Sequence, residues 1–191
     1  MGFALLRDAG CDARGIENAP FFERMLQKGL NCPPSSGMGR LFDGAAAILG
    51  IRETVSYEGQ GAVLLEAAAE ADEGCYPVTL SGNPLLFDWR EMIRTVVKDR
   101  DEGLSIGLIA ARFMNTLVEM AVETALAASR ETGIRDVVLS GGSFQNQYLL
   151  DRLPKALAQA GLRPWTHRRV SCNDEGLSLG QLMIGEYSFE N

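Results

Sequence analysis

The sequence predicts a helix-rich α/β protein, and three observations lead to that prediction. An apolar run at 137–139 is followed by a glycine pair at 141–142 and then by helical periodicity, which is the order of a strand, a turn and a helix. A second extended stretch at 163–167 completes a β-α-β unit with parallel strands and a right-handed crossover. The segment 104–131 is apolar on nearly every side of a helix, which indicates a central core helix.

Two short helices are predicted within residues 3–30. The second runs from about 19 to 28, and Gly29 is a suitable C-terminal stop because glycine adopts the left-handed conformation without strain. The apolar side of this second helix is expected to carry Phe21, Phe22, Met25 and Leu26.

A small-residue loop at 35–39 precedes a helix predicted at about 40–49. A loop that opens a helix in this way is one kind of anion-binding site, and a capped helix that packs an apolar face explains the pattern equally well. The next helix, at about 58–71, is interpreted as structural, with Val63, Leu64 and Ala67 facing inward.

The middle of the chain is predicted to form a β-hairpin and two helices. Glycine, proline and asparagine residues separate strands expected at 76–81 and 84–87. A helix at about 88–98 ends in a charged turn. The long helix at 104–131 follows, and it would extend about 40 Å at 1.5 Å per residue.

The glycine pair Gly141-Gly142 lies where the 137–139 strand, expected to be buried on both faces, gives way to a helix. Glycines lack the Cβ atom that would keep a ligand from the backbone, and Ser143 is predicted to cap the helix. Such a turn binds phosphate or carboxylate in some proteins and is an ordinary α/β turn in others. Pro154 is predicted to kink or split the helix, since an interior proline costs about 3 kcal/mol.

The chain closes with a predicted helix at about 175–187. Asn173 or Asp174 is expected to cap it, because both side chains accept hydrogen bonds from the first helical N–H groups.

The composition is that of a folded globular chain with an acidic balance. The 191 residues are 46% hydrophobic, enough for one domain or two tightly joined subdomains. The net charge of −7 disfavours non-specific binding to nucleic acid or to an anionic membrane surface. The segment 104–128 carries Arg112, Glu119 and Glu123, so it is not expected to span a membrane. The short, early-charged N-terminus is not expected to be a secretory signal.

The cysteines indicate a reducing compartment. Cys11, Cys32, Cys75 and Cys172 show no C-x-x-C spacing, and the single histidine, His167, cannot complete a usual zinc site with them. We therefore expect reduced, mostly buried thiols in a cytoplasmic protein.

Three ordered motifs carry a resemblance to a known family. They are SSGMGRLFDGAAAILGI with YEGQGAVLLEAAA at 35–69, VVLSGGSFQNQYLLDRL at 137–153 and HRRVSCNDEGLSLGQ at 167–181. Together with ARFMNTLVEMAVETA at 111–125, they resemble the C-terminal part of HypF, the carbamoyltransferase of [NiFe]-hydrogenase maturation. More distant resemblances are to tRNA threonylcarbamoyltransferases and antibiotic O-carbamoyltransferases.

The resemblance implies a fold and a domain organisation. The fold would be part of a lobe of the actin and hexokinase type (ribonuclease H-like, ASKHA) with a short mixed sheet. Residues 1–191 would form a single domain, in which 1–34 is a helical lead-in and 35–191 the nucleotide-binding lobe.

The resemblance also implies an activity and partners. One HypF domain makes carbamoyl-adenylate from carbamoyl phosphate and ATP, and the last domain passes the carbamoyl group to the C-terminal cysteine of HypE, where it becomes a cyanide ligand. The chain shows no acylphosphatase-like motif, no zinc-finger cysteine pairs and no adenylate-forming domain. It is therefore expected to need the remaining HypF domains and to be inactive alone.

The site residues that the resemblance implies fall into two sets, and no catalytic residue is assigned. A divalent metal (iron, zinc or magnesium) would be bound by Asp174, although the family's H-x-x-x-H metal motif is absent. Further departures from the family are Met38, Met114, Ser143 and Glu175. The expected contacts to ATP or carbamoyl-adenylate are Gly39, Asp43, Gly141, Gly142, Ser143 and Asn146.

Other functions stay open. A non-catalytic module that binds a nucleotide or docks a partner would have the same glycine-rich loops. A small-molecule kinase or an O-carbamoyltransferase of the same superfamily would also have them, because fold alone does not fix the chemistry.

Overall fold

The computed structural model describes residues 1–82 and 84–190, with the backbone alone for 188–190. The chain is helix-rich, as predicted, and divides into two compact units, Met1–Met120 and a second that starts at Ala121. The predicted helical lead-in, 1–34, belongs to the first unit together with the helices that follow it. Within the described part of the chain, no helix is long and apolar enough to cross a membrane.

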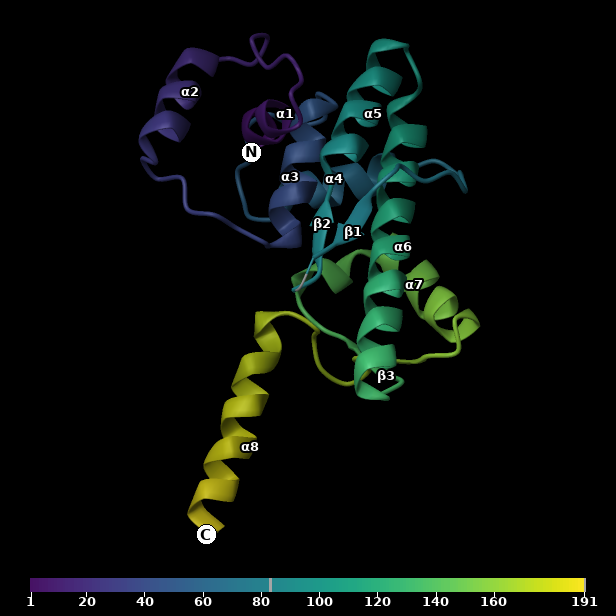
Figure 1. The fold of residues 1–191 in the computed structure, drawn as a ribbon. Coiled ribbons are helices and arrows are strands. Elements are labelled where there is room, and N and C mark those ends of the chain that lie inside the picture. Colours follow the sequence, from purple (N-terminus) through teal and green to yellow (C-terminus); the bar gives the residue numbers. More distant parts are fainter. Residues whose placement is uncertain (83, 191) are drawn as a thin grey trace. The chain divides into compact units, whose positions relative to one another are not determined.

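The first unit consists of six helices, the last of them shared with the second unit, and one hairpin among the described residues (Figure 1). In chain order, these elements are α1 (Gly2–Asp8), α2 (Ala19–Lys28), α3 (Met38–Ile48), α4 (Gln60–Ala68), β1 (Thr79–Ser81), β2 (Leu86–Asp88), α5 (Arg90–Asp101) and the first part of α6 (Ile106–Thr132).

The core of this unit forms where α3 packs against α1 and α4 and where α6 contributes its first half. Phe42 of α3 and Phe113 of α6 are both buried, and their rings meet edge to face with centroids 5.5 Å apart. At Gly44 a Cβ atom would collide with the side chain of Leu5, so this glycine lets α1 cross close to α3. The buried residues of α6 lie between Gly107 and Met120, so the predicted core helix is confirmed for its first half.

Helix α2 has the predicted bounds but not the predicted burial. Gly29 ends it in the left-handed conformation, at a φ of 62°, which confirms the expected stop. The side chains of Phe21 and Phe22 are exposed, and Phe22 contacts Phe3 of α1 at a centroid distance of 5.8 Å. The expected inward face is therefore largely uncovered, because α1 alone is too short to cover it.

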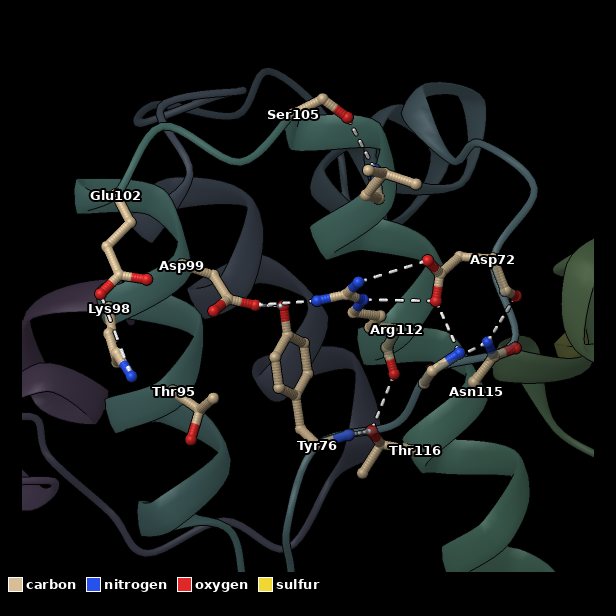
Figure 2. A network of polar contacts seen from close by, with 12 residues as sticks. Asp72, Tyr76, Thr95, Lys98, Asp99, Glu102, Ser105, Arg112, Asn115 and Thr116 are labelled. Atoms are coloured by element: carbon tan, nitrogen blue, oxygen red, sulfur yellow. Dashed lines mark hydrogen bonds and ion pairs between the residues drawn. The ribbon is translucent and has the colours of Figure 1, made fainter.

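A polar network holds the segment after α4 against α5 and α6 (Figure 2). The guanidinium of Arg112 lies 3.3 Å from a carboxylate oxygen of Asp72 and 3.3 Å from one of Asp99. The hydroxyl of Tyr76 donates to Asp99 at 3.0 Å, and the backbone N–H of Tyr76 donates to the hydroxyl of Thr116 at 2.7 Å. Hydrogen bonds from Arg112 lower the pKa of Asp72, whereas burial raises the pKa of Tyr76.

The second unit is a parallel strand pair with a helix on one face, as the β-α-β pattern predicts. Strand β3 (Asp136–Leu139) pairs with β4 (Arg163–Thr166), and Leu139 lies opposite Thr166. The remaining elements are η1 (Gly142–Gln145), α7 (Gln147–Gln159), η2 (Asp174–Gly176) and α8 (Leu177–Glu190). Helix α7 buries Leu149, Leu153 and Leu157.

One prediction about this unit is wrong, and a second is wrong for one of its two alternatives. Leu139 is buried, but Val138 is exposed, because α7 covers one face of the pair and the described residues place no element over Val138. Helix α7 continues through Pro154, so the predicted split does not occur, and the alternative of a kink stays a prediction. Leu153 and Leu157 are buried on either side of the proline, and their packing offsets the lost hydrogen bond.

Instead of the one short mixed sheet expected, the described residues form two separate two-stranded sheets. One is the antiparallel hairpin of β1 and β2, and the other is the parallel pair of β3 and β4. The hairpin strands are only three residues long and lie in the first unit, whereas the parallel pair lies in the second.

The four cysteines are free thiols, but each is partly exposed, so the expectation of mostly buried thiols is wrong. All four lie in connecting segments rather than in the helices that form the core. Burial and a hydrogen bond with Glu119 nevertheless raise the pKa of the Cys75 thiol to about 12. Because the thiolate is the reactive form, a raised pKa makes Cys75 a poor nucleophile near neutral pH.

Candidate functional site

The first group of predicted site residues lines a pocket in the first unit. The pocket has a volume of about 410 Å³ and contains both Gly39 and Asp43. The start of α3 forms one side and the loop before α4 forms the other. The lining residues are Ser35, Gly37, Gly39, Arg40, Asp43, Val55, Glu58 and Gly59.

The loop at 35–39 is held by its own side chains. The hydroxyl of Ser35 accepts a hydrogen bond from the N–H of Gly37 at 3.2 Å, and Gly37 is the residue that precedes α3. Gly37 has an extended conformation, and no side chain caps the helix. Gly39 lies in the first turn, where a Cβ atom would meet nothing within 4 Å. The backbone at Gly39 is therefore open to a ligand.

Charged groups of both signs meet in this pocket. The guanidinium of Arg40 lies 3.1 Å from a carboxylate oxygen of Asp43 and 3.8 Å from one of Glu58. The Asp43 side chain is largely buried, whereas that of Glu58 is exposed. Two carboxylates against one guanidinium leave the lining net negative, which disfavours a phosphate here. Carboxylates accept hydrogen bonds from hydroxyl groups, so the pocket suits a ligand with hydroxyls, such as a ribose.

A close helix contact holds Asp43 in place. At Gly61, in the first turn of α4, a Cβ atom would lie 2.9 Å from Oδ1 of Asp43 and 3.2 Å from its Cα atom. Only a glycine allows α4 to approach α3 this closely. Leu65, one turn further along α4, is fully buried, whereas Val63 is exposed, so the prediction that Val63 faces inward is wrong. The contact at Gly61 sets which face of α4 turns inward.

The segment around YEGQG, interpreted from the sequence as structural, also forms part of the pocket wall. Glu58 and Gly59 line the pocket, and Gly59 adopts a φ of 83°, which turns the chain into α4. The side-chain oxygen of Gln60 accepts a hydrogen bond from the N–H of Ser56 at 2.8 Å, which closes the loop. An acidic residue followed by a glycine directly before a helix was the signal that could have revealed this.

The second group of predicted site residues surrounds the turn after β3. Gly141 has a φ of 107° and donates its N–H to the carbonyl of Cys172 at 2.7 Å. A Cβ atom at Gly142 would meet nothing within 4 Å, so the backbone there is also open. This arrangement leaves an accessible stretch of main chain at the carboxyl end of a parallel strand, where α/β proteins commonly bind ligands.

The helix cap in this turn differs from the prediction. Residues Gly142–Gln145 form a short 3₁₀ turn, and α7 begins at Gln147. The side-chain oxygen of Asn146 accepts a hydrogen bond from the N–H of Leu149 at 2.9 Å, so Asn146 is the cap and the prediction of Ser143 is wrong. Asn146 is buried, and its side-chain oxygen is already bonded to the N–H of Leu149. The 3₁₀ turn displaces the helix start by three residues.

Asp174 was predicted either to cap a helix or to bind a metal ion, and in the structure Asn173 is the capping residue. Asn173 precedes the η2 turn, and its side-chain oxygen accepts hydrogen bonds from the N–H of Glu175 at 3.0 Å and from the hydroxyl of Ser171 at 2.6 Å. Asp174 is exposed. Among the side chains that the structure describes, those of residues 1–82 and 84–187, no three from His, Cys, Asp or Glu lie together in a way that could hold a metal ion. The described residues of this chain alone therefore do not form a metal site.

Another cavity of the second unit contains none of the predicted site residues. It has a volume of about 570 Å³ and lies beside α7 and the segment after β4. His167 lines it, and its Nε2 atom lies 3.0 Å from the hydroxyl oxygen of Ser140, so the ends of β3 and β4 are joined.

Comparison with known proteins gives a consistent result. A family model described as "Carbamoyltransferase, Kae1-like Domain, second subdomain" matches residues 7–181. The carbamoyltransferase HypF of Synechocystis sp. is 39% identical over 165 residues, covering 84% of this chain and 20% of that protein. Carbamoyltransferase HypF2 of Cupriavidus necator is 37% identical over 191 residues, covering 87% of this chain and 24% of that protein.

The fold comparison agrees with these matches. The crystal structure of a full-length HypF in its phosphate- and nucleotide-bound form has a TM-score of 0.85 and 34% sequence identity. The match covers 98% of this chain and 25% of that one. The chain thus spans a fifth to a quarter of the length of these relatives.

Proposed function

Because the chain belongs to the HypF family of carbamoyltransferases, as the second subdomain of the Kae1-like domain, we propose that it takes part in carbamoyl transfer. The acceptor would be the C-terminal cysteine of HypE, and the donor would be carbamoyl-adenylate made by other domains of a longer protein. The single observation that carries this proposal is the family match over residues 7–181. The free thiols agree with a cytoplasmic location for the reaction.

The two groups of site residues have chemistry that suits parts of a nucleotide. In the first unit, Asp43 and Glu58 offer acceptors for ribose hydroxyls, and Gly39 leaves the backbone open beside them. In the second unit, the open main chain at Gly142 suits phosphate oxygens, and Gly141, whose N–H already donates to the carbonyl of Cys172, shapes the turn beside it. Ser143 and Asn146 remain proposed neighbours of the ligand in this turn, with Asn146 acting through the shape of the turn that it caps.

A divalent metal belongs to this proposal only for a complete protein. Asp174 would supply one carboxylate ligand, and the other ligands would have to come from outside this chain. The chain itself holds and orients nucleotide groups, and catalysis of this kind depends mainly on positioning and on stabilising developing charge.

A chimera tests the proposal. In Synechocystis HypF, the fifth of the protein that aligns with this chain is replaced by this chain, and carbamoylation of the HypE cysteine is followed by mass spectrometry. We expect the chimera to modify HypE, with unsubstituted Synechocystis HypF as the control. A chimera that still makes carbamoyl-adenylate but leaves HypE unmodified would contradict the transfer role. That result would favour a non-catalytic nucleotide-binding or docking module.

The isolated chain provides a second test. We expect it to show no ATP–pyrophosphate exchange dependent on carbamoyl phosphate, because its sequence contains no adenylate-forming domain. Exchange by the purified chain alone would refute the assignment of this step to other domains.

A further inference from the structure

The ends of β3 and β4 bring a serine and a histidine together. Ser140 and His167 directly follow the last paired residues of the two strands. The hydroxyl oxygen of Ser140 lies 3.0 Å from Nε2 of His167. The carboxyl ends of parallel strands are the edge at which α/β proteins commonly place their ligands. His167 is the only histidine in the sequence, and the nucleotide contacts proposed above do not use it.

The cavity of about 570 Å³ that His167 lines is adjacent to the glycine turn. Phe144 of η1 lines it, and so does Cys172, whose carbonyl accepts the N–H of Gly141. The open backbone of Gly142 lies in the same turn. A group bound in the cavity would therefore lie next to the position proposed above for the phosphate of a nucleotide.

The lining of this cavity combines apolar walls with two basic side chains. The walls include Phe144, Leu150, Pro154 and Val170. The basic residues are His167 and Arg168, and none of the described residues that line the cavity is acidic. In a chain of net charge −7, such a lining favours a small anionic group with an apolar body. The free carboxylate at the end of a peptide is a group of this kind, and its capture is a recurring mode of peptide recognition.

The acceptor proposed above has such an end. Its C-terminal cysteine carries both a carboxylate and a thiol, and the thiol must lose its proton because the thiolate is the nucleophile. Imidazole is the side-chain group best suited to accept a proton near neutral pH. A hydroxyl both donates and accepts hydrogen bonds, so Ser140 can accept from the Nε2–H group of His167 and leave the lone pair on Nδ1 for a proton.

We propose that this cavity is the acceptor subsite, in which Arg168 binds the carboxylate of the C-terminal cysteine and His167 accepts the thiol proton. The inference rests on the proposed function and names how its acceptor is held. The thiol proton passes to Nδ1 of His167, sulfur forms a bond to the carbamoyl carbon, and the bond from that carbon to the phosphate oxygen breaks. AMP leaves with the electron pair of the broken bond, and His167 returns its proton to solvent. Ser140 is a positioning residue, because it acts only through the imidazole ring.

The chimera with Synechocystis HypF described above provides the test. Initial rates of HypE carbamoylation, measured by mass spectrometry over a range of HypE concentrations, separate kcat from KM. His167→Gln keeps a hydrogen-bonding group beside Ser140 but accepts no proton, so kcat should fall by about 100-fold or more while KM for HypE changes little. His167→Ala should lose kcat to a similar extent and regain part of it when imidazole is added to the solution, which a purely structural role would not produce.

Arg168→Gln tests the carboxylate contact. KM for HypE should rise by about tenfold or more, the scale of a lost hydrogen bond between charged groups, while kcat changes little. HypE with an amidated C-terminus, made by peptide ligation, should show the same rise with the unsubstituted chimera and no further rise with Arg168→Gln. The matched control is Arg169→Gln, at an exposed neighbour outside the cavity lining, which should keep both constants.

Three outcomes would overturn the acceptor subsite in a chimera that is active before substitution. They are an unchanged kcat in His167→Gln, no response of His167→Ala to imidazole, and the same KM for HypE in Arg168→Gln and Arg169→Gln. Circular dichroism and unchanged formation of carbamoyl-adenylate check that each variant is folded. An unsubstituted chimera that leaves HypE unmodified would overturn the proposed function and this inference with it, so the two failures are distinguishable.

Discussion

Gly61→Ala should weaken the contact between α3 and α4 on which the pocket around Asp43 depends. The added methyl would lie 2.9 Å from Oδ1 of Asp43, 3.2 Å from its Cα atom and 3.3 Å from Cβ of Ala46. Two of these three atoms belong to the backbone or to a Cβ, so a side-chain rotation cannot relieve them. The two helices must separate by a few tenths of an ångström.

The expected loss of stability follows from this geometry. Adding one methyl to a packed contact costs about 1–3 kcal/mol. Alanine recovers less than about 1 kcal/mol of helix propensity, since Gly61 lies at the second position of α4, where the helix gains least. We therefore expect a net loss of about 1–2 kcal/mol. With a urea slope of roughly 1–3 kcal/mol/M, the unfolding midpoint should fall by roughly 0.3–2 M.

Gly39→Ala is the matched control for this change. Gly39 also lies in the first turn of its helix, but its added methyl would meet nothing within 4 Å, and its backbone is not left-handed. Its urea midpoint should stay the same or rise. The free energy of unfolding should increase by at most about 1 kcal/mol. Equal midpoints for Gly61→Ala and the unsubstituted chain, measured beside this control, would refute the close approach of α4 to Asp43.

Three further predictions concern the second unit and the polar network. Gly142→Val should leave the urea midpoint unchanged, because a Cβ atom at this position has open space. It should abolish ADP binding in a calorimetric titration, because the side chain blocks access to the backbone. Unaltered binding would show that this turn is not part of the site. Asp174→Asn should change the free energy of unfolding by less than about 0.5 kcal/mol, because Asn173 is the cap. In a full-length protein it should abolish carbamoyl transfer. Full transfer activity would show that Asp174 is an ordinary surface residue. The hydrogen bonds from Arg112 hold the pKa of Asp72 below its ordinary value in the folded chain, so Asp72 adds stability above about pH 4 that is lost as the pH falls through the folded pKa. Arg112→Gln removes the largest cause, so its urea midpoint should decline less between about pH 5 and about pH 3 than that of the unsubstituted chain; an equally steep decline would contradict this assignment.

The sequence was sufficient for the local elements of the fold. Apolar periodicity and Gly29 predicted α2 with its observed bounds, and the strand, glycine turn and helix after Asp136 formed in the predicted order. The parallel pairing of β3 with β4 also followed from the order of elements along the chain. These features depend on backbone preferences and on contacts between near neighbours, which a single sequence records.

The motifs of the sequence also led to the family. The segments at 35–69 and 137–153 both lie within the region that the family model matches. They predicted Gly39 and Asp43 as site residues, and both line one pocket. That Glu58 also lines this pocket became visible only in the structure. Glu58 is separated from Asp43 by a loop whose path the local pattern does not determine.

Burial and capping were decided by the tertiary structure. Leu65 rather than Val63 faces the core, because Gly61 lets α4 contact α3 on that side. Val138 is exposed although its sequence is that of a buried strand, and α7 passes through Pro154 because the leucines around it are packed. An apolar residue is buried only if an element from elsewhere in the chain, or from another part of a longer protein, covers it. The sequence therefore determines which surfaces need a partner, and tertiary packing decides which of them receive one.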